Sequence, residues 1–162
     1  MGYDYIVADQ KLLDKLSEEA SNSKRLRKNF NFHQLEDVVQ RFLNALEPDT
    51  YVRVHRHLNP PKHECFMVIR GSFALILFDD IGNNPEVIIL DQFSNRGIDL
   101  QPGIWHTVIS LEKGSIFFET KDGPYNPLND KDFAAWAPEE GTPESKELLN
   151  KWKKMAIDKQ KK

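Results

Sequence analysis

The residues of this 162-residue chain that could do chemistry are three histidines and one glutamate in its central part. His55 and His57 stand two residues apart, Glu64 follows, and His106 comes later in the segment Pro102-Gly103-Ile104-Trp105-His106. Three imidazoles and one carboxylate are a complete ligand set for a divalent transition metal. The rest of the sequence must therefore provide a scaffold that brings Glu64 and His106 to the His55/His57 pair.

The scaffold that residues 50–120 predict is made of short strands. Runs rich in β-branched and aromatic residues alternate with turn signals, and no helical pattern separates them. The expected strands cover residues 51–57, 64–70, 72–78, 86–91, 97–100, 106–111 and 115–121. Residues 79–84 have turn chemistry, so residues 74–78 and 86–91 are expected to pair as a hairpin. This pattern indicates a β-sandwich or barrel rather than a parallel α/β sheet.

Helices are expected on both sides of this stretch. Residues 10–20 carry a short stripe of leucines. A second helix is predicted over residues 31–46, because Asn31 and Gln34 match a capping box and apolar residues then recur at helical spacing. A last helix begins at Thr142-Pro143, with threonine as N-cap and proline in the first turn. We therefore divide the chain into an N-terminal helical cap (1–49), a β-barrel (50–123), and an irregular segment with a C-terminal helix packed on the barrel (124–162).

Strand alternation predicts which side chains share the barrel interior. Residues i and i+2 of a strand point to the same face, so His55 and His57 point the same way. Tyr51 and Arg53 have the same parity and are expected to line the same cavity. Glu64 lies at one end of the next strand, where it can meet the histidines across the ladder.

The spacing of the four candidate ligands resembles the two motifs of the cupin superfamily. His55-Arg56-His57 with Glu64 and Gly71 is similar to the first motif, and Pro102-Gly103 with His106 is similar to the second. The spacer between the second histidine and the glutamate is longer than usual, so a small loop must be absorbed there. The resemblance implies a mainly β fold, the cupin double-stranded β-helix or jelly-roll barrel, with N-terminal helices and a C-terminal helix around it.

A narrower resemblance, to the WbuC family, covers nearly the whole chain. It rests on Arg25-x-Arg27-x-Asn29-x-Asn31-x-His33, Val39-Gln40-Arg41, Thr50-Tyr51-Val52, Glu119-Thr120-Lys121-Asp122-Gly123-Pro124-Tyr125 and Ala135-Trp136-Ala137-Pro138-Glu139. WbuC proteins are cupin-fold metalloproteins often associated with bacterial surface-polysaccharide clusters. The resemblance implies that Arg25, Arg27 and His33 fold back toward the barrel mouth or a partner subunit. Without the resemblance, the same basic residues are interpreted as a surface exposed to solvent.

Glu119 is the candidate acid or base beside the metal, because a carboxyl among phenylalanines inside a barrel has a raised pKa suited to proton transfer. The alternative is an exposed ion pair between Glu119 and Lys121. Arg53 is the second candidate catalytic residue, an anion clamp with a planar guanidinium, and its alternative is a salt bridge at the rim. The candidate substrate-binding residues are Tyr51, Tyr125 and Lys121, with core packing as the alternative for the two tyrosines.

Three histidines and a glutamate leave coordination positions free, which is typical of catalytic metal sites. We expect one divalent transition metal ion, and Zn, Fe, Ni, Mn and Co all suit these ligands. The first hypothesis is a metal-dependent enzyme of bacterial surface-polysaccharide biosynthesis that acts on a sugar or nucleotide-sugar by isomerase-like or epimerase-like proton transfer. The alternatives are an Fe(II)-dependent dioxygenase and a non-catalytic module that binds a metal or a sugar.

The bulk composition argues against other classes of function. A net charge of -3 and the lack of a basic recognition helix argue against nucleic-acid and anionic-membrane partners. No apolar run approaches the ~20 residues of a membrane span, and the N-terminus does not resemble a signal peptide. The single cysteine, Cys65, fits a reducing compartment. We expect a cytoplasmic protein with a small-molecule substrate, and a homodimer on the ground that dimers are common among cupins.

Overall fold

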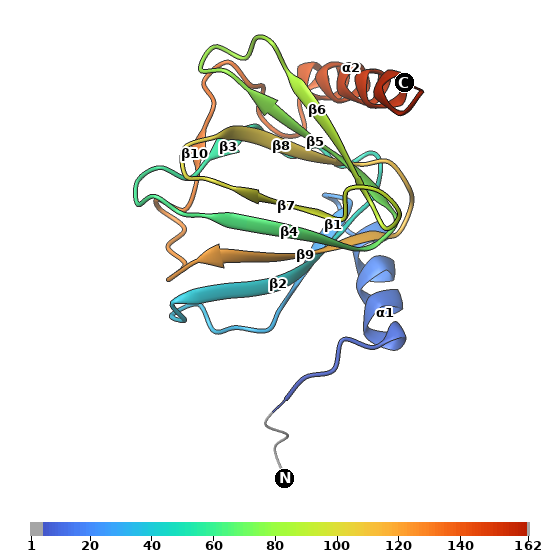
Figure 1. The fold of residues 1–162 in the computed structure, drawn as a ribbon, viewed down its shortest axis with the longest axis vertical. Helices are drawn as coiled ribbons and strands as arrows, with labels where there is room; N and C mark the ends of the chain where they lie inside the picture. The colour runs from blue at the N-terminus through green and yellow to red at the C-terminus, as the bar shows by residue number, and fades with distance from the viewer. Residues whose placement is uncertain (1–4, 162) are drawn as a thin grey trace.

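The computed structural model describes residues 5–161, which form two facing antiparallel sheets with a helix at each end of the chain (Figure 1). The elements in chain order are α1 (Gln10–Ser21), β1 (Arg27–Asn31), β2 (Val39–Leu46), β3 (His55–Arg56), β4 (Glu64–Arg70), β5 (Ser72–Phe78), β6 (Glu86–Asp91), β7 (Gly97–Leu100), β8 (Trp105–Ser110), β9 (Ser115–Asp122), β10 (Asp132–Phe133) and α2 (Pro143–Gln160). The first sheet has the order β1-β2-β9-β4-β7, and the second has the order β10-β3-β8-β5-β6. Each sheet thus combines strands from distant parts of the chain.

Three apolar clusters hold these layers together. One lies between the sheets and includes Phe66 and Phe117 of the first sheet and Leu75 of the second. Another joins the second sheet to α2, which packs on it through residues such as Trp152 (Figure 1). The third joins α1 to the outer face of the first sheet. Since α1 and α2 each cover one sheet, much of the strand sequence is apolar on both faces.

The predicted helix over residues 31–46 is wrong, because this part of the chain contains the strands β1 and β2, which pair with each other. In β2, Phe42 and Leu46 face the space between the sheets, whereas Leu43 and Ala45 contact α1. Burial of both faces over residues 42–46 gives a short run that is apolar except for Asn44. Such a run also satisfies the i, i+3, i+4 spacing of a helix, so periodicity alone does not distinguish the two.

Most other predicted elements are confirmed. The strands β4 to β7 have the predicted bounds, and β5 pairs with β6 as the predicted hairpin. Thr142 caps α2 by accepting a hydrogen bond from the backbone N–H of Ser145. Only His55 and Arg56 of the predicted strand 51–57 belong to β3. The sheets also take in β1 and β2 from the predicted helical cap 1–49 and β10 from the predicted irregular segment 124–162. No helix in residues 5–161 is long and apolar enough to span a membrane.

The strand register brings the candidate site residues to facing positions on the two sheets. In the second sheet, His55 of β3 pairs with His106 of β8. In the first sheet, Glu64 of β4 pairs with Lys121 of β9, and Glu119 lies two residues earlier on the same strand. Because alternate residues share a face, Glu119 and Lys121 both point into the space between the sheets.

Two glycines of the cupin-like motifs form the turns beside these strands. Gly71 separates β4 from β5 with a φ of +76°, and a Cβ at this position would overlap the Ser115 side chain. Gly103 precedes β8 with a φ of +85°. This left-handed backbone is readily adopted by glycine, which explains both motif positions.

Candidate metal centre

His55, His57, Glu64 and His106 lie together between the two sheets. Each offers a ligand atom, and these atoms are all within 4.8 Å of one another. All four side chains are buried. The structure therefore brings together the four residues that the sequence predicted as metal ligands. His55 lies in β3 and His57 directly after it, whereas Glu64 lies in β4 and His106 in β8.

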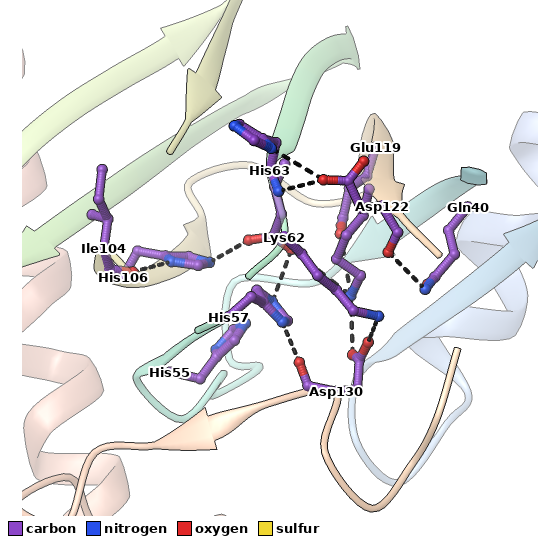
Figure 2. A network of polar contacts seen from close by, with 12 residues as sticks. Gln40, His55, His57, Lys62, His63, Ile104, His106, Glu119, Asp122 and Asp130 are labelled. Carbon is purple, nitrogen blue, oxygen red and sulfur yellow. Dashed lines mark hydrogen bonds and ion pairs between the residues drawn. The ribbon is translucent and has the colours of Figure 1, made fainter. Parts of the chain in front are cut away.

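The Nδ1 atom of each of the three candidate ligand histidines faces a backbone carbonyl, and Figure 2 shows this contact for His57 and His106. The partners are Arg53 for His55 at 2.9 Å, Ile104 for His106 at 2.9 Å, and Asp130 for His57. A carbonyl oxygen only accepts, so each Nδ1 carries a proton and donates it, and in the neutral ring the lone pair is on Nε2. Hydrogen bonds of this kind orient and polarise metal-binding histidines.

The Nε2 lone pairs face the carboxylate of Glu64. Its Oε1 lies 3.0 Å from Nε2 of His57, and its Oε2 lies 3.1 Å from Nε2 of His106. Nε2 of His57 is buried and makes no hydrogen bond within the part of the chain that the structure describes. Two acceptor groups at this distance repel each other unless a cation or a proton lies between them. A divalent metal ion would satisfy all four side chains, so the residues present fit such an ion.

The protonation states agree with this arrangement. Burial lowers the pKa of His55 well below its ordinary value, which keeps the ring neutral. Burial alone would raise the pKa of Glu64, but hydrogen bonds and positive charge from the side of His106 and His57 outweigh burial and lower the pKa well below the ordinary range, so the carboxylate is stable where a proton or a cation lies between it and these rings. Neutral imidazoles and an ionised carboxylate are the forms that bind a metal.

The cluster borders a cavity of about 550 Å³ between the sheets. Its polar lining includes the side-chain amides of β1 and β2, from Asn29, Asn31, Gln40 and Asn44. Its apolar lining includes Phe42, Leu46, Phe66, Val108 and Phe117, and most of these also belong to the first sheet. His55, Glu64 and His106 contribute to the lining, so a molecule in this cavity could reach the candidate metal position.

Glu119 and Lys121 of β9 are buried and line this cavity, so the alternative of an exposed ion pair is wrong. Nδ2 of Asn44 donates a hydrogen bond of 2.8 Å to Oε2 of Glu119. Burial raises the pKa of Glu119 to about 8, and the negative charge of Glu64 adds to the rise, whereas Lys121 opposes it. Nζ of Lys121 lies 3.8 Å from Glu64 and 4.0 Å from Glu119. Glu119 is therefore a buried carboxyl with a raised pKa beside the candidate metal ligands, as proton transfer near neutral pH requires.

Arg53 and Tyr51 do not line the cavity, and the prediction that they share it with the histidines is wrong. The guanidinium of Arg53 donates to two backbone carbonyls of residues 134–137. The Tyr51 ring stacks on Trp152 at 5.6 Å, and its hydroxyl donates to the carbonyl of Pro138 at 2.9 Å. The residues before β3 belong to no strand, so the two-residue alternation that aligned them with His55 does not extend to them.

Tyr125 and Lys121, the other two predicted substrate-binding residues, do line the cavity. Tyr125 is 38% exposed, which places it at the cavity's edge. Arg25, Arg27 and His33 also line the cavity, in agreement with what the WbuC resemblance implied about the barrel mouth. Arg25 and Arg27 both bind Glu140 in the loop before α2. Nη2 of each arginine lies 2.7 Å from Oε2 of Glu140.

Sequence reasoning missed three buried polar residues at this site, namely Asn44, Lys62 and Asp130. Asn44 fell within the predicted helix, so its inward position could not be recognised. Lys62 lies in the loop before β4, where strand alternation gives no signal about the direction of a side chain. Asp130 lies in a segment without regular structure, and no local pattern in the sequence marks it.

Comparisons with known proteins add a family match and a fold. Residues 8–90, about half of the chain, match a family model described as a domain of unknown function (DUF6016). No curated protein matches the chain. Among solved structures, the capsular polysaccharide assembling protein CapF from Staphylococcus aureus has a TM-score of 0.58 at 18% identity, over 68% of this chain and 30% of that one.

Two further solved structures are similar. Oxalate decarboxylase from Bacillus subtilis has a TM-score of 0.51 at 16% identity, over 66% of this chain and 27% of that one. An oxalate oxidase has a TM-score of 0.52 at 14% identity, over 70% of this chain and 57% of that one. The chain thus spans about a third or less of the length of CapF and of the decarboxylase. These are cupin-fold proteins, and the predicted cupin fold is confirmed.

Proposed function

We propose that this chain, which belongs to the DUF6016 family, is a metal-dependent enzyme that acts on a sugar or a nucleotide-sugar by proton transfer. One observation carries the proposal: the buried cluster of three histidines and Glu64 borders the same cavity as the buried carboxyl of Glu119. A metal position with an adjacent acid is the arrangement that an isomerase-like or epimerase-like reaction requires.

In this proposal His55, His57, Glu64 and His106 hold one divalent transition metal ion, such as Zn, Fe, Ni or Mn. When bound, the ion supplies a Lewis acid that polarises a carbonyl or hydroxyl oxygen of the substrate. The four protein ligands leave room for a substrate oxygen, since an open position distinguishes catalytic metal sites from structural ones.

Glu119 is the residue that we expect to move a proton to or from the substrate. The amide of Asn44 fixes one of its oxygens at 2.8 Å, so the carboxyl has a defined orientation in the cavity. Lys121 has an ammonium group among Glu64, Glu119 and Asp130, where it offsets negative charge that would otherwise accumulate beside the substrate. Arg53, which lies outside the cavity, has no part in this mechanism.

The cavity lining supports a sugar as the substrate class. Side-chain amides along β1 and β2 can donate to and accept from hydroxyl groups, and the apolar side chains of the lining suit the carbon-bound hydrogens of a sugar ring. The resemblance of the sequence to the WbuC family and the likeness to a capsular polysaccharide assembling protein agree with a role in bacterial surface-polysaccharide biosynthesis.

Deuterium exchange tests this function without knowledge of the product. The metal-loaded protein would be incubated with a panel of nucleotide-sugars in D₂O, and deuterium uptake at carbon would be followed by mass spectrometry. We expect uptake with the wild type and with Glu86→Gln, an exposed control on β6. We expect none with Glu119→Gln, although metal stays bound. Undiminished exchange in Glu119→Gln would eliminate the proposed role of this residue.

The same ligand set suits Fe(II), so an Fe(II)-dependent dioxygenase is the second candidate. Oxygen consumption by the iron-loaded protein, without carbon-bound deuterium uptake, would favour it. A non-catalytic metal- or sugar-binding module requires no buried acid beside the ligands, and the placement of Glu119 therefore weighs against it.

The remaining expectations about the whole protein are proposals too. We propose a cytoplasmic protein, with which the free thiol of Cys65 is compatible, and a homodimer with a small-molecule substrate and no nucleic-acid or membrane partner. Light scattering during gel filtration would measure the mass of the assembly and test the dimer.

A further inference from the structure

Asp130 is a buried acid that the proposed mechanism does not use. It lies between β9 and β10, where Leu128 is 93% exposed but Asp130 is only 4% exposed. Its carboxylate is held between two buried lysines. Oδ1 lies 3.0 Å from Nζ of Lys62 (Figure 2), and Oδ2 lies 3.0 Å from Nζ of Lys121. A buried carboxylate with a cation on each oxygen has a fixed position.

The backbone of the same residue contacts a candidate metal ligand. Nδ1 of His57 donates to the carbonyl oxygen of Asp130 (Figure 2). His55 and His106 donate to carbonyls only two residues away in the chain, whereas Asp130 is 73 residues away from His57. The orientation of His57 therefore depends on a tertiary contact, and the two lysines fix the segment that provides this contact.

The carboxylate of Asp130 also determines the position of a competing cation. Nζ of Lys121 lies 3.0 Å from Asp130 and 3.8 Å from Glu64, so both acids attract the same ammonium group. The contact with Asp130 is the shorter one. Without the negative charge of Asp130, the ammonium would be attracted mainly to Glu64, where it would compete with a metal ion for that carboxylate.

We propose that Asp130 is a positioning residue of the candidate metal centre. Its carbonyl holds His57 in the metal-binding orientation, and its carboxylate keeps Lys121 away from Glu64. This inference rests on the proposed metal site, and Asp130 acts through its neighbours rather than by contact with the ion. Loss of an outer partner of this kind typically weakens metal affinity by about 10- to 100-fold.

Asp130→Asn removes the charge that holds the two lysines and retains the backbone carbonyl. We expect the Kd for Zn²⁺, measured by competition with a chromophoric chelator, to rise by at least about tenfold. The visible absorption of the Co²⁺-loaded variant should also change, because His57 and Glu64 are displaced. The matched control is Asp132→Asn, the same charge change in the same segment at a residue paired with Arg56 at 3.8 Å. It should leave both readouts unchanged.

Asp130→Asn leaves Lys62 and Lys121 without the countercharge of Asp130, and this loss can prevent the variant from folding. A second variant keeps the test decisive in that case. Lys62→Met keeps the pair of Lys121 and Asp130 and removes only one of the two contacts that fix the segment. We expect a weaker but measurable loss of Zn²⁺ affinity. Wild-type affinity in every folded variant of this pair would overturn the role of Asp130. A wild-type protein that binds no divalent metal would instead overturn the metal centre itself, and this role with it.

Discussion

At the scale of single residues, the candidate centre is defined by where protons and charges lie. Three imidazoles donate their Nδ1 protons to carbonyls and present Nε2 lone pairs to one buried carboxylate. Nearby, Lys62 and Lys121 contact Asp130, Lys121 also lies close to Glu64, and burial raises the pKa of Glu119 to about 8. A cation at the centre would therefore meet three imidazole nitrogens and the carboxylate of Glu64.

Replacement of Glu64 by glutamine should remove the metal site without unfolding the protein. The amide of Glu64→Gln can donate a hydrogen bond to Nε2 of His57 or His106, so it relieves the repulsion between the two acceptors. It supplies no negative charge to a cation. We expect a loss of Zn²⁺ affinity larger than the roughly 10- to 100-fold typical for outer partners. Chelator competition would measure the affinity, and wild-type affinity would contradict the assignment of Glu64 as a ligand.

Tyr51 should contribute to stability and not to metal binding. Its hydroxyl donates to the Pro138 carbonyl, and its ring stacks on Trp152 of α2, away from the cavity. Tyr51→Phe removes only the hydroxyl, and we expect a loss of about 1 kcal/mol in the free energy of unfolding, measured with urea. The affinity for Zn²⁺ should not change. A loss of Zn²⁺ affinity in Tyr51→Phe at unchanged stability would contradict the placement of Tyr51 outside the site.

At the scale of elements, the strand β2 can be tested against the helix that the sequence predicts over residues 31–46. Substitutions of Leu35 and Leu43 distinguish the two structures. A helix over residues 31–46 would place Leu35 and Leu43 on one buried face. In the structure Leu35 is 50% exposed, whereas Leu43 is buried against α1. We expect Leu43→Ala to destabilise the protein by roughly 2–5 kcal/mol. Leu35→Ala should have an effect of no more than about 0.5 kcal/mol, as is usual at the surface. Equal losses in urea unfolding would contradict the strand.

Glu140, in the loop before α2, binds Arg25 and Arg27 at the start of β1, and this contact should depend on pH. Burial alone would raise the pKa of Glu140, but hydrogen bonds from Arg25 and Arg27 lower it from 4.5 to about 2. A carboxyl with a lowered pKa in the folded state stabilises the protein above its unfolded pKa and loses this contribution as the pH falls.

The Glu140 contribution should therefore be complete above about pH 4.5 and decline toward pH 2. The measurement is the difference in unfolding free energy between wild type and Glu140→Gln at a series of pH values. We expect a constant difference near neutral pH that shrinks across this window. A difference that stays constant down to pH 2 would show that the charge of Glu140 contributes nothing.

The elements that could be predicted from the sequence are those marked by local chemistry. Thr142-Pro143 marked the start of α2, the turn residues 79–84 marked the β5–β6 hairpin, and the ligand spacing marked the centre. The orientation of Arg53 and Tyr51 could not be predicted, because it depends on carbonyls and an aromatic ring from residues 134–152. The contact of Asp130 with His57 joins residues 73 apart and leaves no local signal.

At the scale of the whole molecule, two sheets with different inner surfaces enclose one site. The second sheet supplies His55 and His106, and the first supplies Glu64, Glu119 and Lys121 together with the amide side chains of β1 and β2. The two helices cover the outer faces (Figure 1), so the space between the sheets is left for the site. Because ligands come from both sheets, a bound ion should stabilise the packing of one sheet on the other.

Metal removal should therefore lower the stability of the whole fold. An ion that binds only the native state at about 100 times its Kd adds about 2.7 kcal/mol to the free energy of unfolding. We expect the chelated wild type to unfold at lower temperature than the Zn²⁺-loaded protein, and we expect no such difference in Glu64→Gln. Equal melting temperatures with and without metal in the wild type would contradict a native-state metal site.

The central claim is that His55, His57, Glu64 and His106 hold a divalent metal ion at the edge of the cavity. Anomalous diffraction from crystals of the metal-loaded protein, recorded on both sides of the absorption edge of the metal, tests it most directly. We expect one strong anomalous peak between the three Nε2 atoms and the carboxylate of Glu64. An absence of anomalous signal at this position in fully loaded crystals, or a peak at other residues only, would contradict the claim.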